Sequence, residues 1–296
     1  MLHIEPSRDA KVGMATVRRA LPRRERRTIG AWCFADHIGP SKTPDGAGDD
    51  GPGGIGPHPH IGLQTVTWLL DGELLHRDSL GSEQSIRPGQ LNLMTAGHGI
   101  AHAEEGRTPG GAVLHGIQMW VALPDATRDG EAAFEHHAEL PSFDLGIGTG
   151  TVLVGETMGV RSPARADTDH HGVQLVLRPG STVLPLLVEH EHAVIVLDGA
   201  LELGDGATPL VPGEVGIVDA GADELAITAV SDSTAMLLGG TPFEWPIHMW
   251  WNFVARDRSE IDRAADDWRA GTDRFGETGS PMSRIDVGPP PWRHAD

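Results

Sequence analysis

The 296-residue sequence predicts an all-β fold of two tandem β-barrels of one type, followed by a short C-terminal helix. Three observations predict this fold class. Glycine (39 residues) and proline (22 residues) are abundant, as in chains built from many short strands joined by turns. Two segments of the chain repeat each other, and a clear helical pattern occurs in the C-terminal tail. A chain of this length can form two medium domains, each with its own core.

The repeat is visible at two places in each half. LLDGEL (Leu69–Leu74) recurs as VLDGAL (Val196–Leu201), 127 residues later at the Asp-Gly pair. RPGQLNLMTAG (Arg87–Gly97) is echoed by VPGEVGIVDAG (Val211–Gly221) at an offset of 124 residues. Similarity at a nearly constant spacing indicates two copies of one structural unit.

The Asp71-Gly72 pair follows a run of alternating apolar residues, which is typical of a strand that ends in a hairpin turn with positive φ. Each copy is therefore expected to be a small antiparallel barrel or sandwich. We assign the first barrel to residues 1–145 and the second barrel, with the helix and tail, to residues 146–296. The joint between them is expected near Ser142–Gly150.

The tail predicts one helix, with Ser259 as its N-cap and Gly271 as its stop signal. Ile261, Ala265 and Trp268 fall on one face of this helix. We expect that face to pack against one of the barrels.

Composition excludes several classes of function. Acidic residues outnumber basic ones by 42 to 23, for a net charge of −19, which disfavours direct binding to nucleic acid or to an anionic membrane. No run approaches the ~18 apolar residues that a membrane helix needs. The N-terminal residues lack the apolar core of a signal peptide, so we expect a cytoplasmic protein.

Cys33 is the only cysteine, which rules out an internal disulfide and a cysteine-based zinc site.

Two pairs of polar residues indicate a metal site in the first barrel. His58 and His60 stand two residues apart in a predicted strand, and so do His102 and Glu104. Alternate side chains of a strand share one face, so each pair offers two ligands roughly 6.5–7 Å apart along its strand. Together the pairs can supply three nitrogens and one oxygen to one ion, and an octahedral ion would keep two positions for substrate or oxygen.

The alternative is that His58 and His60 are turn or rim histidines, because pairs at this spacing arise by chance on surfaces. The accompanying pair of His102 and Glu104 favours the metal site. Four buried polar groups that point into one barrel would be costly without an ion to satisfy them.

The second half contains His190 and His192 at the same spacing, but out of register. The repeat offset carries His58 and His60 to Pro185 and Leu187, whose side chains cannot bind a metal. The positions that correspond to His102 and Glu104 are filled by alanine and threonine. We therefore expect the second barrel to lack a metal, and the whole chain to bind one ion.

Two other groups of residues, which could have been functional, are expected to have structural roles. The adjacent residues His170 and His171 point to opposite faces of any strand, so we expect them at the surface. Cys33 lies between Trp32 and Phe34 and is expected to be a buried small hydrophobic residue rather than a nucleophile.

Longer motifs resemble those of a known family. They are VRRALP (Val17–Pro22), FADHIGP (Phe34–Pro40), the run from PHPHIG to GIAHAEE (Pro57–Glu105), LHGIQMWVALP (Leu114–Pro124) and GGTPFEW to AADDW (Gly239–Trp268). From about Arg18 to about Gly276 the chain resembles the pirins, which belong to the cupin superfamily.

The resemblance implies two cupin-type β-barrels with one metal, usually iron, in the N-terminal barrel. The ligand positions of the family motif fall on His58, His60, His102 and Glu104, the same set that the spacing selects. The expected ion is Fe(II), and the alternatives that such donors accept are Mn, Ni, Cu and Zn.

Two positions depart from the family motif, which usually reads HPHRG with an acidic residue further on. Here Ile61 replaces the basic residue and Gln64 the acidic one. Neither position is a family metal ligand, but both changes alter the charge near the cavity mouth or around the ligands.

The resemblance also implies a function. Bacterial pirins of this kind are associated with ring-opening of the flavonol quercetin, so the first hypothesis is a dioxygenase in which Glu104 shuttles the hydroxyl proton. The alternative is a redox-sensing, metal-bearing regulatory protein that docks onto a protein partner, and a third is a non-oxidative cupin such as an isomerase. A cavity of mixed polarity beside the metal would favour the enzyme, and a large exposed apolar patch the regulator.

Overall fold

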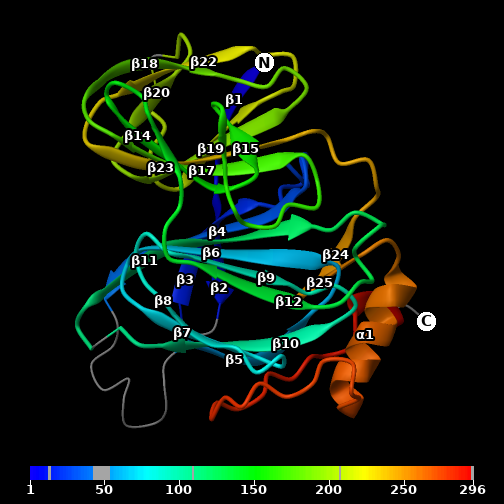
Figure 1. The fold of residues 1–296 in the computed structure, drawn as a ribbon. Coiled ribbons are helices and arrows are strands. Elements are labelled where there is room, and N and C mark those ends of the chain that lie inside the picture. The colour runs from blue at the N-terminus through cyan, green and yellow to red at the C-terminus, as the bar shows by residue number, and fades with distance from the viewer. Residues whose placement is uncertain (13–14, 43–53, 109, 207, 295–296) are drawn as a thin grey trace.

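A computed structural model describes residues 1–12, 15–42, 54–108, 110–206 and 208–294. The chain forms two β-sandwich units stacked on one another, and one helix lies beside the first unit (Figure 1). The predicted all-β fold with a short C-terminal helix is confirmed. No helix within the described ranges is long and apolar enough to cross a membrane.

The first unit has a large and a small sheet. The large sheet has the order β12 (Ala133–His137), β9 (Leu91–Thr95), β6 (Leu63–Asp71), β11 (Val113–Ala122), β4 (Trp32–Lys42), β3 (Ala15–Leu21) and β2 (Arg8–Val12). The small sheet has the order β5 (Gly54–His60), β10 (Ile100–Gly106), β7 (Leu74–Asp78) and β8 (Glu83–Ile86).

The second unit has the same plan. Its large sheet has the order β1 (Leu2–Pro6), β21 (Glu214–Val218), β19 (Glu191–Asp198), β23 (Ser233–Gly240), β17 (His170–Leu177), β14 (Gly148–Val154) and β13 (Ser142–Asp144). Its small sheet has the order β18 (Gly180–Pro185), β22 (Glu224–Ala229) and β20 (Leu201–Leu203), and a short hairpin joins β15 (Glu156–Thr157) to β16 (Val160–Arg161).

The repeat seen in the sequence maps onto matching strands. β6 and β19 each lie between two neighbours of the same kind and end at an Asp-Gly pair. Gly72 and Gly199, the glycines of these pairs, have φ of 88° and 79°, as the predicted hairpin turns require. A side chain at Gly199 would also collide with the backbone of Asp232, because its Cβ would lie 2.3 Å from that carbonyl oxygen.

Both ends of the chain cross from one unit to the other. β1 pairs with β21, so the first residues extend the large sheet of the second unit. The C-terminal segment returns to the first unit, where Phe253 bridges to Ile61. Ser142–Gly150, the expected joint, forms the β13–β14 hairpin of the second unit instead of a linker. The division into residues 1–145 and 146–296 is kept as a proposal for the two repeated units.

The two large sheets pack against each other and share one core. Trp68 and Ile117 of the first unit belong to the same buried cluster as Ile195 and Leu238 of the second. Along β19, Ala193, Ile195 and Leu197 face this shared core, whereas Val194 and Val196 face the interior of the second unit. Both faces of β19 are therefore buried.

The helix α1 (Arg258–Ala270) ends at Gly271, as predicted, with a φ of 65° at that residue. The predicted N-cap was wrong. Asp257 is the cap, since its carboxylate accepts a hydrogen bond from the Glu260 amide, and Ser259 lies inside the first turn. The predicted apolar face is buried, and it packs with Phe253 and Ile61 over the small sheet of the first unit.

Candidate metal centre

Two strands of the small sheet bring three histidines together. β5 and β10 are antiparallel neighbours in which His58 lies directly opposite His102, and His60 lies opposite Ile100. His58 and His60 share a strand face, so both rings reach His102. All three side chains are buried. One ring nitrogen of each histidine lies within 4.8 Å of the others.

The spacing of the nitrogens suits a transition metal. The Nε2 atoms of His60 and His102 are 3.0 Å apart. Two ligands at right angles on an ion with bonds of about 2.1 Å would lie about 3.0 Å from each other. The pair is therefore already at the separation of neighbouring metal ligands.

Backbone carbonyls fix the tautomers of two of the rings. His58 Nδ1 donates to the Gly56 carbonyl at 2.8 Å, and His60 Nδ1 donates to the Asn252 carbonyl at 3.0 Å. Each Nε2 atom is left with its lone pair free, as a metal ligand needs. Burial lowers the pKa of His58 to about 4, and burial together with the neighbouring His58 ring holds the pKa of His60 well below its usual value. The rings are neutral at physiological pH.

A buried chain of two further side chains orients His102. His76 Nε2 donates to the Asp78 carboxylate at 3.0 Å, so His76 Nδ1 is an acceptor. That atom lies 3.4 Å from His102 Nδ1, which can donate to it in a long hydrogen bond and so keep its Nε2 free for a metal. Burial would raise the pKa of Asp78, but hydrogen bonds from His76 and Ser82 outweigh it and hold the pKa below its ordinary value.

The sequence prediction missed His76 and Asp78. The signal was an H-x-D pair at the end of β7, which neighbours β10 with His76 opposite Glu104 and Asp78 opposite His102. Such a pair shares one strand face, as the two predicted pairs do. Only the pairing of β7 with β10 brings it beside the predicted ligands.

Glu104 lies two residues after His102 on β10, and the register between β10 and β5 shifts between these two residues. Burial raises the pKa of its carboxyl to about 7, and a hydrogen bond from Thr67 opposes that rise. In the part of the chain that the structure describes, the tight group of ligand atoms contains His58, His60 and His102 but not Glu104. Glu104 as the fourth ligand therefore stays a prediction.

Aromatic side chains surround the rings. Trp120 meets His60 edge-on with a centroid separation of 5.2 Å, and it stacks on Phe34 at 4.0 Å. On the other side Phe134 stacks on His76 at 4.3 Å. His58, His60, His102 and Glu104 are all buried, with 8% exposure or less.

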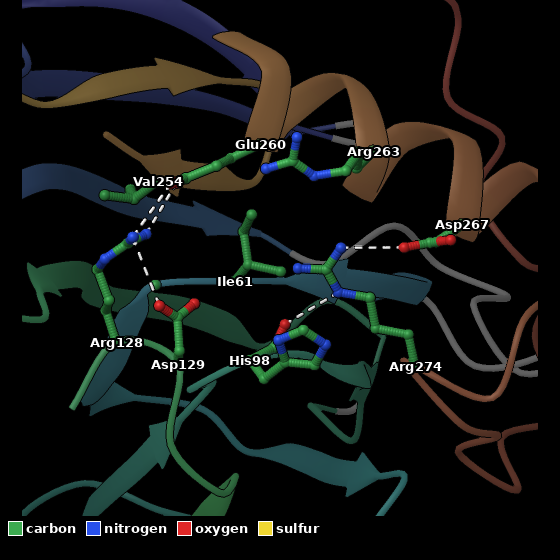
Figure 2. A pocket seen from close by; sticks show the side chains of 10 residues that line it. Ile61, His98, Arg128, Asp129, Val254, Glu260, Arg263, Asp267 and Arg274 are labelled. Carbon is green, nitrogen blue, oxygen red and sulfur yellow. Dashed lines mark hydrogen bonds and ion pairs between the residues drawn. The ribbon is translucent and has the colours of Figure 1, made fainter. Parts of the chain in front are cut away.

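A pocket of about 340 Å³ lies beside α1 (Figure 2). Its lining includes Arg128, which pairs with Glu260, and Arg274, which pairs with Asp267. Ile61, the residue after the H-x-H pair, lies in its wall, but the three clustered histidines do not line it. The pocket is therefore separate from the candidate metal centre.

Two family models match the chain. The model described as Pirin covers residues 14–121, and the one described as Pirin C-terminal cupin domain covers residues 173–276. A Pseudomonas aeruginosa protein named "Putative quercetin 2,3-dioxygenase" is 43% identical over 97% of this chain and 90% of its own length. The chain belongs to the pirin family.

A further sequence relative and a solved structure are also similar to this chain. A pirin-like protein of Caulobacter vibrioides is 37% identical over 90% of this chain and 92% of its own length. A solved structure of quercetin 2,3-dioxygenase from Acinetobacter baumannii has a TM-score of 0.90 and 40% identity, covering 98% of this chain and 96% of that one. The histidine cluster of this pirin fits a metal site of the kind that its cupin fold holds.

The structure also locates the two departures from the family motif. Ile61 packs with Phe253 in the core beneath α1. Gln64 is buried in β6 and donates to the Thr95 hydroxyl at 3.0 Å. The Gln64 carbonyl oxygen has no hydrogen-bond partner among the described residues.

Of the other residues singled out in the sequence, Cys33 is buried as expected, and burial raises the pKa of its thiol to about 12, which disfavours the thiolate form. The expectation for His170 and His171 was wrong, because both are buried, at 2% and 1% exposure. His190 and His192 are buried as well.

Proposed function

We propose that this pirin binds one iron(II) ion through His58, His60, His102 and Glu104, and that it is a dioxygenase acting on a quercetin-like flavonol. The observation that carries the proposal is the convergence of three buried imidazoles. Their Nδ1 atoms are hydrogen-bonded to backbone carbonyls or to His76, which leaves the Nε2 atoms for a metal. The names of the Pseudomonas and Acinetobacter relatives support the choice of substrate class.

The donor set suits iron, and it also accepts Mn, Ni, Cu or Zn. A bound ferrous ion supplies a Lewis acid that can also change its oxidation state. The protein contributes position: the Gly56 and Asn252 carbonyls and the His76 ring hold the three imidazoles in fixed orientations. Trp120, Phe34 and Phe134 give the surroundings an apolar, aromatic character that favours a planar aromatic substrate over water.

Glu104 is the proposed proton carrier. Burial raises the pKa of its carboxyl to about 7 in the metal-free protein, so the carboxylate is a stronger base than usual. With one oxygen on the metal, the other oxygen can take the proton of an acidic flavonol hydroxyl and return it later.

The test is oxygen consumption by protein loaded anaerobically with iron(II) and offered a panel of flavonols. We expect turnover by the iron form, and none by the zinc form, because zinc has no accessible redox change. His102→Ala should abolish turnover, and His248→Ala, which removes an exposed histidine, should leave it unchanged. Equal conversion of the flavonol by the iron and zinc forms, without oxygen uptake, would overturn the redox proposal in favour of a non-oxidative cupin. Silence with every flavonol at verified iron occupancy would favour a regulatory protein, in which ferrous and ferric forms differ in affinity for a protein partner.

A further inference from the structure

A second group of buried histidines lies in the C-terminal unit. One ring nitrogen of His171, His190 and His192 lies within 4.8 Å of the others. Their side chains are 1%, 2% and 0% exposed, as deeply buried as the first cluster. The ring centroids of the three are 5.3 to 6.0 Å apart.

The sheet brings His171 and His192 together over a glycine. β23 runs between β17 and β19, and Gly239 is the register partner of His171 on one side and of His192 on the other. A Cβ at Gly239 would lie 2.4 Å from His171 Nε2 and 2.9 Å from His192 Cδ2. The two imidazoles can meet only because this position has no side chain.

Strand alternation directs the cluster into the second unit. Val173 and Val194 share faces with His171 and His192, and both valines belong to the interior core of that unit. The three histidines therefore lie at one end of the second sandwich. They use the large sheet, whereas the first cluster uses the small one.

Most ring nitrogens of this second cluster lack a hydrogen-bond partner among the described residues. Neither ring nitrogen of His171 or His192 has a partner among the described residues, and His190 Nδ1 also has none. Buried polar atoms are nearly always paired, and five unpaired nitrogens in one cluster are exceptional. A cation bound between the three rings would accept one lone pair from each ring and so satisfy three of the five nitrogens.

His190 is already in the tautomer that a ligand needs. Its Nε2 donates to the Asp169 carboxylate at 3.1 Å, which leaves the lone pair on the unpaired Nδ1. A histidine whose outer nitrogen is bound to a carboxylate is the usual arrangement around protein metals. Burial, ahead of the repulsion between the rings, lowers the pKa of His192 to about 4 and holds the pKa of His171 well below its usual value, so both rings are neutral donors at physiological pH.

We propose that His171, His190 and His192 form a second metal site, which binds a late transition-metal ion of the zinc(II) class. Three neutral imidazoles without a carboxylate suit zinc, nickel or copper and do not suit magnesium or calcium. The burial of all three side chains makes the site structural: the ion ties the segment before β19 to β17 across β23.

The site is not a remnant of the first one. The positions equivalent to His58 and His102 are Pro185 and Ala226, on β18 and β22 of the small sheet, and neither can bind a metal. The sequence predicted one ion per chain because His190 and His192 are out of register with His58 and His60. A site built on other strands does not need that register.

The experiment uses the full chain with the first site removed by His60→Ala and His102→Ala, and cobalt(II) as the probe. We expect this variant to bind one cobalt per chain, with visible ligand-field absorption, and to gain about 5 °C or more in Tm when zinc is added in large excess over its dissociation constant. Adding Gly239→Ala or His192→Gln should remove the absorption and the shift, and adding His248→Ala should remove neither.

Circular dichroism of each variant shows whether it is folded. Two independent substitutions, one of a ligand and one of the glycine beside it, keep the test valid if either variant fails to fold. A folded double variant of the first site that binds no cobalt would overturn the proposal. Unchanged cobalt absorption in both the Gly239→Ala and the His192→Gln proteins would overturn it equally, because the ion would then lie elsewhere.

Discussion

At the scale of single residues, the two histidine clusters differ in how their outer nitrogens are satisfied. In the first, His58 and His60 donate to backbone carbonyls, and His102 is oriented by His76 and Asp78. In the second, only His190 has such a partner among the residues that the structure describes. The first cluster is therefore the more rigid of the two, as expected of a site that must hold a reactive ion in a fixed geometry.

The role assigned to His76 can be measured. We expect His76→Gln to weaken metal binding at the first site by about 10 to 100 times, because His102 loses the group that fixes its tautomer. His136→Gln is the matched control, since this histidine is bonded to Asn92 on the neighbouring β9. Anaerobic titration of each variant with iron(II) gives the affinities. Equal affinities for the two variants would show that His76 does not position the ligand.

The Glu104 carboxyl predicts a pH dependence of metal binding. Its pKa of about 7 lies above the ordinary value, so below pH 7 an ion must displace a proton to bind it. The pKa of His58 is about 4, so that ring does not titrate in the same range. We expect affinity to fall about tenfold per pH unit from pH 7 to 5.5 in the wild type. Glu104→Gln should bind more weakly at pH 7 and vary little over this range. A parallel fall in both proteins would exclude Glu104 as a ligand.

At the scale of elements, the sequence predicted those features that depend on local periodicity. Alternation along β5 and β10 placed His58, His60 and His102 correctly on shared faces, and the Asp-Gly pairs marked the hairpins. The partners of these residues come from distant segments, and no local pattern reveals them. The Asn252 carbonyl that orients His60 lies between β24 (His248–Trp250) and β25 (Phe253–Ala255), 192 residues further along the chain.

The error at His170 and His171 has the same origin. Adjacent residues do point to opposite faces of β17, but at this end of the strand neither face is exposed. His170 packs edge-on against Trp32 of the first unit, with centroids 5.4 Å apart, and His171 points into the second unit. Alternation predicts which side chains share a face, but burial of that face depends on what packs against it.

The corrected N-cap of α1 predicts how two substitutions change the stability of the protein. We expect Asp257→Ala to lower the free energy of unfolding by about 1 kcal/mol, because the Glu260 amide loses its acceptor. Ser259→Ala should have a smaller effect, since its hydroxyl donates to the Asp257 carboxylate and accepts from Arg263 but satisfies no backbone amide of the first turn. Urea unfolding of both variants measures the difference. A larger loss for Ser259→Ala would restore Ser259 as the functional cap.

At the scale of the whole molecule, the shared core between the large sheets couples the two units. Trp68 and Leu238, one from each unit, lie in the same buried cluster. β1 and the C-terminal segment also cross between the units, so neither half has all its packing partners within its own stretch of chain. The repeat in the sequence predicted two similar units but not this coupling, because packing between units is not periodic.

The core shared by the two units predicts that they unfold together in one cooperative transition. Ile195 lies on β19 of the second unit and faces the shared core, and we expect Ile195→Ala to cost about 2–5 kcal/mol. The chain's eight tryptophans all lie outside the repeated strands of the second unit, between β4 and β11 or after β23. Tryptophan fluorescence should nevertheless report the same lowered midpoint as circular dichroism. An unshifted fluorescence midpoint would mean that the units unfold independently.

The most direct test of the account is an anomalous difference map at the iron edge from crystals of iron-loaded protein. The proposed function predicts one strong iron peak about 2.1 Å from the Nε2 atoms of His58, His60 and His102, with a Glu104 oxygen at similar distance. Absence of that peak at verified iron content, or a peak only at His171, His190 and His192, would contradict the assignment of the first cluster as the iron site.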